Sequence, residues 1–186
     1  SSTSRGLGDV YKRQGVIRAS GADLIPVPLR PENGFRNSAD DIAARITPKT
    51  SAILLTTPHN PSGSVLTRAD IDAIGRLAIK HDFWIISDEV YEELIFDGAE
   101  FTSPLYLPEL ADRVIVVSSI LKSHAAPSFR SGWGVGPAEF TEALFPLPET
   151  MLFGNQPFIA DMTEKAIRDR SSVASGMGQR HAERAG

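Results

Sequence analysis

The sequence lacks cysteine, long apolar runs and any concentration of basic residues. Without cysteine, disulfides, thiolate catalysis and cysteine-ligated metals are excluded. The longest apolar runs, such as residues 53–55 and 114–117, are the size of strands and far shorter than the roughly 18 residues that cross a bilayer. The net charge is -4, the lysines and arginines are scattered, and no two histidines stand at ligand spacing. We therefore expect a cytoplasmic protein with no metal site and with neither a membrane nor a nucleic acid as partner.

The 186 residues are 41% hydrophobic and 23% charged, which suffices for one globular domain with a hydrophobic core. Residues 1–14 lack the apolar segment of a secretory signal, and their hydrophobic positions form neither a strand face nor a helix face. We expect this stretch to be a non-native leader. Residues 169–186 are polar, contain no closing apolar strand, and are expected to begin a truncated C-terminal region.

Between these ends, short apolar runs rich in β-branched residues alternate with longer segments of helical period, which is typical of a parallel α/β sheet. The expected strands are residues 23–29, 51–56, 83–87, 114–118 and 132–136. Pro26 and Pro28 remove two backbone donors from the first, so we expect it to lie at a sheet edge or to stop early.

Two capping patterns predict helices. Ser38 followed by Asp41 starts a helix that we expect to reach Ile46, and Thr67 with Asp70 starts one that extends to about Lys80. In the second helix, positions 71, 74, 77 and 78 are apolar at helical spacing and would face the sheet.

Polar groups follow three consecutive expected strands. They are the run PHNPSG at residues 58–63, the run DEVY at 88–91 and the run SILK at 119–122. Taken singly, these are ordinary turn chemistry, a solvated or capping acid, and a surface lysine. The carboxyl ends of parallel strands meet at one edge, where ligands of such sheets bind. The combination therefore predicts a site at this edge.

The same segments carry a family resemblance. PHNPSG at 58–63, SDEVY at 87–91, and Ser119 with Lys122 followed by Arg130 and GW at 132–133 resemble the successive signatures of class I/II aminotransferases, in that family's order and spacing. The similarity extends over residues 15–168 and corresponds to the central part of a fold-type I enzyme that depends on pyridoxal 5'-phosphate (PLP). It is closest to aminotransferases of the aspartate and arginine–pyruvate kind.

The resemblance implies the three-layer α/β/α large domain of PLP-dependent transferases, here incomplete, with a mostly parallel sheet and an antiparallel strand at 132–136. Residues 15–168 would form part of this PLP-binding large domain. We also expect a cis bond between Asn60 and Pro61, since tight functional turns retain that isomer. A homodimer is implied for the complete protein, because residues 151–157 resemble the loop that reaches the partner's active site in the family.

The resemblance assigns six residues to the cofactor: Asn60, Asp88, Tyr91, Ser119, Lys122 and Arg130. Lys122 would hold PLP as a Schiff base and move a proton from the substrate Cα. Asp88 would stabilise the protonated ring nitrogen, while the amide and the phenol would hydrogen-bond the ring's phenolic oxygen. The hydroxyl and the guanidinium would bind the phosphate. Lys122, Asp88 and Tyr91 would be the catalytic members.

Two positions depart from the family pattern. Leu121 stands where Ser or Thr is usual, so we expect one phosphate donor to be lost. Ser128 stands where the family has a glycine; a positive φ there would strain a serine by about 1 kcal/mol or more.

The implied activity moves an amino group from an amino acid to a 2-oxo acid in a ping-pong cycle, and the sequence does not identify the amino acid. Three alternatives stay open. The first is a PLP-dependent C–S lyase or a related lyase on the same fold, and the second is a non-catalytic PLP-binding regulator domain. The third is an inactive aminotransferase fragment without the N-terminal phosphate loop and the C-terminal carboxylate-binding arginine of the family.

Overall fold

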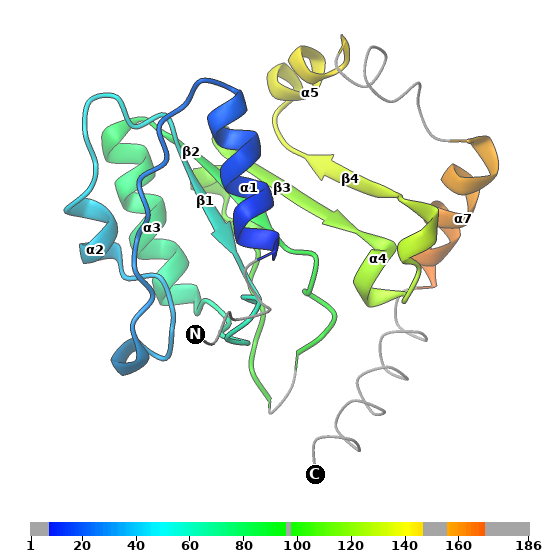
Figure 1. The fold of residues 1–186 in the computed structure, drawn as a ribbon, viewed down its shortest axis with the longest axis horizontal. Coiled ribbons are helices and arrows are strands. Elements are labelled where there is room, and N and C mark those ends of the chain that lie inside the picture. Colours follow the sequence, from blue (N-terminus) through cyan, green and yellow to red (C-terminus); the bar gives the residue numbers. More distant parts are fainter. Residues whose placement is uncertain (1–7, 96–97, 147–155, 170–186) are drawn as a thin grey trace.

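A computed structural model describes residues 8–95, 98–146 and 156–169, and this part of the chain contains a four-stranded sheet. The strands β1 (Ala52–Thr56), β2 (Trp84–Asp88), β3 (Val114–Ser119) and β4 (Gly132–Val135) lie in this order across it. The first three are parallel, and β4 is antiparallel to β3 (Figure 1). The predicted α/β class, the mostly parallel sheet and the reversed last strand are confirmed.

Helices and short 3-10 turns connect the strands (Figure 1). The α-helices are α1 (Gly8–Ala19), α2 (Ala39–Ala43), α3 (Arg68–His81), α4 (Ile120–Ser123), α5 (Ala138–Leu144) and α7 (Pro157–Arg168). The 3-10 helices are η1 (Pro31–Asn33), η2 (Pro104–Tyr106), η3 (Pro108–Leu110) and η4 (Pro127–Phe129). Among residues 8–95, 98–146 and 156–169, no helix has both the length and the apolar character that a membrane span requires.

The core lies between α3 and the sheet. Ile71, Ile74 and Ala78 of α3 are buried, as their spacing predicts, and Leu77 is partly buried against the same cluster. The strands and the η2–η3 segment supply the other main members of this cluster, which are Leu55, Phe83, Ile85, Leu107, Leu110, Val114 and Val116. This packing fixes β1, β2 and β3 relative to one another, and so fixes where their carboxyl ends meet.

Local signals set both ends of α3. Thr67 Oγ1 accepts a hydrogen bond from the backbone N–H of Asp70, and the Asp70 carboxylate accepts one from the N–H of Thr67, which completes the expected capping box. The helix ends at His81, where Asp82 follows with a left-handed φ of 54°. Arg113 Nη1 donates to Asp82 Oδ1 at 3.1 Å and so connects this helix end to the residue before β3.

Three parts of the structure differ from the sequence predictions. Residues 23–29 form no strand, because Pro26 and Pro28 leave too few N–H donors for a ladder. The helix that starts at Ser38 ends at Ala43 rather than Ile46, since Thr47 precedes Pro48 and a helical conformation there is disfavoured. α1 begins inside residues 1–14, where no element was expected; its apolar residues do not repeat at helical spacing, so periodicity did not reveal it.

Candidate functional site

The candidate site lies at the carboxyl ends of the parallel strands. Thr56, the last residue of β1, pairs with Asp88, the last residue of β2. Asp88 in turn pairs with Val117 of β3. The three polar segments that follow these strands therefore start at the same edge of the sheet, as their positions in the sequence predict.

Three of the six predicted residues are in contact at this edge. Asn60 Nδ2 donates a hydrogen bond to Tyr91 Oη at 3.1 Å. The ammonium of Lys122 lies 5.7 Å from the centroid of the Tyr91 ring, within cation–π range. Lys122 is exposed, while Asn60 and Tyr91 are partly buried. An amide and a phenol from two separate loops and an accessible amine from the short helix α4 thus converge.

The loop that carries Asn60 is held by its own backbone. His59 N–H donates to Ser64 O at 2.8 Å and Gly63 N–H donates to His59 O at 2.7 Å, with Gly63 at a left-handed φ of 73°. The Asn60–Pro61 bond is cis, which confirms the prediction, and the Thr57–Pro58 bond is also cis, which was not predicted. His59 Nδ1 lies 2.8 Å from Ser62 Oγ, so this histidine serves the turn.

Asp88 and Glu89 point to different sides of the sheet, as expected for neighbours at a strand end. Asp88 is partly exposed, and its Oδ1 accepts from the N–H of Val90 at 3.3 Å. Glu89 is 2% exposed, and its Oε1 accepts from Ser103 Oγ at 2.8 Å. Burial raises the pKa of Glu89 to about 7, and the bond from Ser103 opposes that shift.

This buried acid is a feature that the sequence analysis missed. Strand alternation gives a signal that could have found it, because Ile85, Ser87 and Glu89 share the core-facing side. A carboxyl group at one of these alternating, core-facing positions is expected to be buried. Its partner Ser103, fourteen residues further along the chain, has no such signal.

Ser119 directly precedes the very short helix α4, and Lys122 lies within it. Ser119 ends β3, pairs with Gly132 of β4, and is the residue before α4. Its side chain makes no capping bond to α4. Lys122 is the third of the four residues of α4, so two residues of one helical turn separate it from Ser119 at the sheet edge.

Arg130 takes no part in the contact among Asn60, Tyr91 and Lys122. It is exposed, and the hydrogen bond of its guanidinium goes to Pro127 O, from Nη1 at 3.5 Å. Its φ is 52°, in the left-handed region. The positive φ on which strain at Ser128 depends is not present, since Ser128 lies inside η4 and the left-handed residues of this loop are Ala125 and Arg130. The loop is wound as two single turns, and each turn ends in a left-handed residue.

The side chains at this edge fit a flat ring that carries an aldehyde and an oxygen substituent. The amine of Lys122 is accessible for covalent attachment, and the amide and phenol beside it offer donors to an oxygen of the ring. Asp88 supplies a carboxylate on the adjacent strand end. Within the described ranges no cluster of three or more histidine or acidic residues could hold a metal ion. Residues 151–155 of the expected partner-reaching loop lie outside the described residues.

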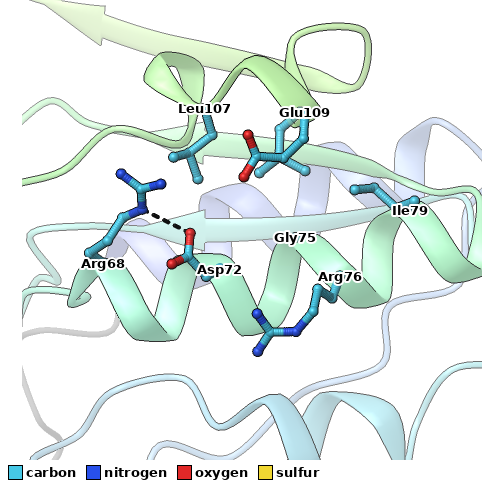
Figure 2. A pocket seen from close by; sticks show the side chains of 8 residues that line it. Arg68, Asp72, Gly75, Arg76, Ile79, Leu107 and Glu109 are labelled. Carbon is cyan, nitrogen blue, oxygen red and sulfur yellow. Dashed lines mark hydrogen bonds and ion pairs between the residues drawn. The ribbon is translucent and has the colours of Figure 1, made fainter.

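A cavity of about 220 Å³ lies elsewhere, between α3 and the η2–η3 segment (Figure 2). Its lining residues are Arg68, Asp72, Gly75, Arg76, Ile79, Leu107, Glu109 and Leu110. Arg68 Nε donates to Asp72 Oδ1 at 2.8 Å across its floor. None of the six predicted site residues borders it, so we assign it no part in the site.

The sequence matches the family described as aminotransferase class I and II over residues 13–185. It is 51% identical over 154 residues to the arginine–pyruvate transaminase of Pseudomonas aeruginosa, an alignment that covers 83% of this chain and 39% of that protein. It is 39% identical over 128 residues to an aspartate aminotransferase of Streptomyces avermitilis, covering 68% of this chain and 31% of the relative. The chain thus spans less than half the length of these relatives.

Solved structures agree with these sequence matches. The N-succinyldiaminopimelate aminotransferase of Mycobacterium tuberculosis superposes with a TM-score of 0.84 at 31% identity, over 91% of this chain and 45% of that one. The aspartate aminotransferase of Thermus thermophilus with maleate gives a TM-score of 0.81 at 28% identity, over 90% and 43%.

Proposed function

Since the chain belongs to the class I and II aminotransferase family, whose members use PLP, we propose that it transfers an amino group from an amino acid to a 2-oxo acid. The observation that supports this most directly is the convergence of Lys122, Tyr91 and Asn60 at one edge of the sheet. The bound cofactor supplies an electron sink that stabilises negative charge at the substrate Cα. The residues of this chain bind and orient the cofactor and move the proton.

Lys122 has two roles in this proposal. Its amine is the attachment point for the cofactor aldehyde, which explains why an exposed lysine stands over an aromatic ring rather than in an ion pair. With substrate and cofactor bound, its neutral amine would take the proton from the substrate Cα and deliver it to the cofactor carbon that carried the aldehyde. Both roles need an accessible Nζ, and Lys122 is exposed.

Asp88, Tyr91 and Asn60 orient and tune the ring. The carboxylate of Asp88 favours the protonated form of the ring nitrogen, because opposite charges at close range stabilise each other. The Tyr91 hydroxyl and the Asn60 amide would donate hydrogen bonds to the phenolic oxygen, and their mutual bond at 3.1 Å holds them side by side. Ser119 and Arg130 hold the phosphate in this assignment, Arg130 through a bidentate grip.

Borohydride reduction in the presence of PLP, followed by peptide mapping, tests the assignment. We expect the reduced adduct on Lys122. The matched controls are Lys80, exposed near the end of α3, and Lys165, exposed on α7. An adduct on either control, with Lys122 unmodified, overturns the site.

A second measurement separates the transferase from a lyase on the same fold. Mixing the PLP-loaded protein with an amino acid should convert the cofactor absorbance to that of pyridoxamine phosphate with release of a 2-oxo acid. Arginine with pyruvate is the first pair to try, because the relative that is 51% identical is named for it. Release of pyruvate together with ammonia from the amino acid would reject transamination.

The expected partners are the amino acid, the 2-oxo acid and a second copy of the complete protein. We expect a homodimer because members of the family are generally dimeric. A measurement of the molar mass in solution tests this. A cytoplasmic location stays a prediction, as do the division of the chain into residues 1–14, 15–168 and 169–186 and the roles of the six site residues.

A further inference from the structure

The loop that carries Lys122 is bonded to α7 through the side chain of His124. The two ring nitrogens of His124 both have partners: Nδ1 lies 2.8 Å from Ser123 Oγ, and Nε2 lies 3.0 Å from the carbonyl oxygen of Ala166. His124 is also the residue that follows α4, two positions after Lys122. One imidazole therefore bridges the helix of the proposed cofactor lysine and a helix that lies 42 residues further along the chain.

The directions of these two bonds follow from the chemistry of the partners. A carbonyl oxygen only accepts, so Nε2 of His124 carries the hydrogen and donates to Ala166. In the neutral ring Nδ1 is then an acceptor, and Ser123 Oγ donates to it. Ser123 is 4% exposed, so water does not easily replace its bond. The ring is held in one tautomer and one orientation.

The Ala166 carbonyl accepts a donor from outside α7. Ala166 lies in the last turn of that helix, where carbonyls are commonly bonded by groups from elsewhere in the protein. No residue of α7 is buried, so apolar packing contributes little to holding this helix in place. A donor at its carboxyl end also faces the negative end of the helix dipole, which strengthens the bond.

A second polar contact joins α7 to the other end of the same loop. Thr163 Oγ1 lies 2.7 Å from Ser131 Oγ and 2.7 Å from Ile159 O. The threonine hydroxyl is the donor to Ser131 Oγ, and its hydrogen is shared between this oxygen and the Ile159 carbonyl. Ser131 is 2% exposed and directly follows Arg130. The segment 124–131 is thus bonded to α7 at both ends.

Helix α4 cannot orient Lys122 alone. It has four residues, a single turn, and isolated turns are unstable because nucleation costs more than one hydrogen bond returns. We infer that His124 is a positioning residue for Lys122, which fixes the last turn of α4 to α7 through Ser123 and the Ala166 carbonyl. The consequence of this inference for catalysis rests on the proposed function. The hydrogen-bonded connection between α4 and α7 through His124 does not depend on it.

The test compares three variants in the full chain. His124→Phe keeps a ring of similar size and removes both bonds, whereas His124→Gln places an amide N–H near the Ala166 carbonyl. His81→Phe is the matched control, since His81 is exposed at the end of α3. The rate at which PLP and borohydride label Lys122 should fall about ten-fold in the Phe variant, the effect of roughly one net hydrogen bond. The Gln variant should recover to within about three-fold of wild type, and the His81 variant should match wild type.

Hydrogen exchange without cofactor keeps this inference separate from the proposed function. The amides of residues 120–124 should exchange about ten-fold faster in His124→Phe than in wild type, and less so in His124→Gln. If wild-type Lys122 takes no label while the exchange result holds, the proposed function fails and the positioning link stands. If both labelling and exchange are unchanged in the Phe variant, or if Gln behaves like Phe, the link is overturned.

A variant at the other contact covers the case in which His124→Phe does not fold. Thr163→Val keeps the shape of the side chain and removes the hydroxyl that meets Ser131. It should speed exchange at residues 129–131 while leaving residues 71–78 of α3 protected as in wild type. Equal exchange at 129–131 in both proteins would contradict the role of α7.

Discussion

Different forces hold two regions of the molecule. The α3 side is formed by α3, β1 and β2, and the Lys122 side is formed by residues 119–131 and α7. On the α3 side, Ile74 and Ala78 are 0% exposed and the helix is capped at both ends by side chains or a left-handed residue. On the Lys122 side, α7 has no buried residue, and Phe158 is 59% exposed. Apolar burial stabilises the first region, whereas the second is held by a few directional hydrogen bonds and by one fully buried apolar side chain, Ile120.

This difference separates stability from chemistry. The packing of the strands against α3 fixes the positions of their carboxyl ends. The polar groups that follow these ends are placed by the strands and do not depend on a separate hydrophobic core. The Lys122 loop contains left-handed Ala125 and Arg130, each unfavourable by about 1 kcal/mol for an L-residue. A loop with such a conformation persists because the sheet and α7 constrain it at both ends.

The largest expected effect is chemical and comes from the Lys122 side. Lys122→Ala should lower transamination at least about 1,000-fold, because attachment and proton transfer both lose their amine. The midpoint of thermal unfolding should stay within a few degrees of wild type, since the side chain is exposed. Lys165→Ala is the control for charge. A large loss of stability in Lys122→Ala would contradict the separation of the two regions.

The next effect is on the α3 side and concerns stability. Ile74→Ala should lower the free energy of unfolding by about 2–5 kcal/mol, because a fully buried side chain leaves a cavity. Met162→Ala on α7 should cost less than about 1 kcal/mol, since Met162 is 38% exposed. Urea unfolding of both variants measures the contrast. Equal losses would show that α7 is packed as firmly as α3.

Glu89 lies at the boundary between the two regions and links stability to pH. Its pKa is raised from 4.5 to about 7 in the folded chain, so the folded state holds the proton more tightly than the unfolded state. This contribution is complete below pH 4.5 and is lost as the pH rises through 7, by up to about 3 kcal/mol. The carboxylates of Glu92 and Asp88 add to the upward shift.

Glu89→Gln removes this titration while keeping the shape of the side chain. Unfolding midpoints measured at pH 5 and pH 8 should fall less between the two values in the variant than in wild type. Glu109→Gln, an exposed acid of η3, is the control for net charge. Parallel changes in all three proteins would show that Glu89 does not titrate in this range.

The smallest effect tests a local signal. Thr67→Ala removes the acceptor for the Asp70 N–H at 3.1 Å and should lower the free energy of unfolding by about 1 kcal/mol. Asp70 also binds Arg36 at 2.8 Å, so Thr67→Ala isolates the cap better than a change at Asp70 does. Urea unfolding beside Thr67→Ser, which keeps the hydroxyl, gives the value for the cap alone.

The parts of the fold that the sequence predicted are those with a repeating or local cause. Apolar spacing located α3, β-branched runs located β1 to β3 within one residue, the short run at 132–136 matched β4 within one residue, and Thr67 with Asp70 marked a helix start. Prolines account for the failure at residues 23–29 and for the short α2, where donors or helical angles are lost. α1 has no apolar periodicity and left no signal.

For the candidate site, the sequence predicted the shared edge of the strands and the polar segments that meet there. It did not predict which of the six residues touch. The contact among Asn60, Tyr91 and Lys122 depends on the shapes of two loops and on the direction of the short helix α4, and the position of Arg130 depends on a backbone wound into two single turns. Bonds between distant segments, such as Glu89 with Ser103 and His124 with Ala166, have no local pattern.

Gly132 limits how this corner of the protein can vary. A Cβ at that position would lie 2.8 Å from the carbonyl oxygen of Ser118 and 3.2 Å from the Cβ of Ser119. Any other residue would have to push β4 away from the strand that leads into α4, and the hydroxyl of Ser119 would move with it. The absence of a side chain at position 132 is therefore what lets β4 lie this close to β3. Any chain that keeps this geometry needs glycine at the equivalent position.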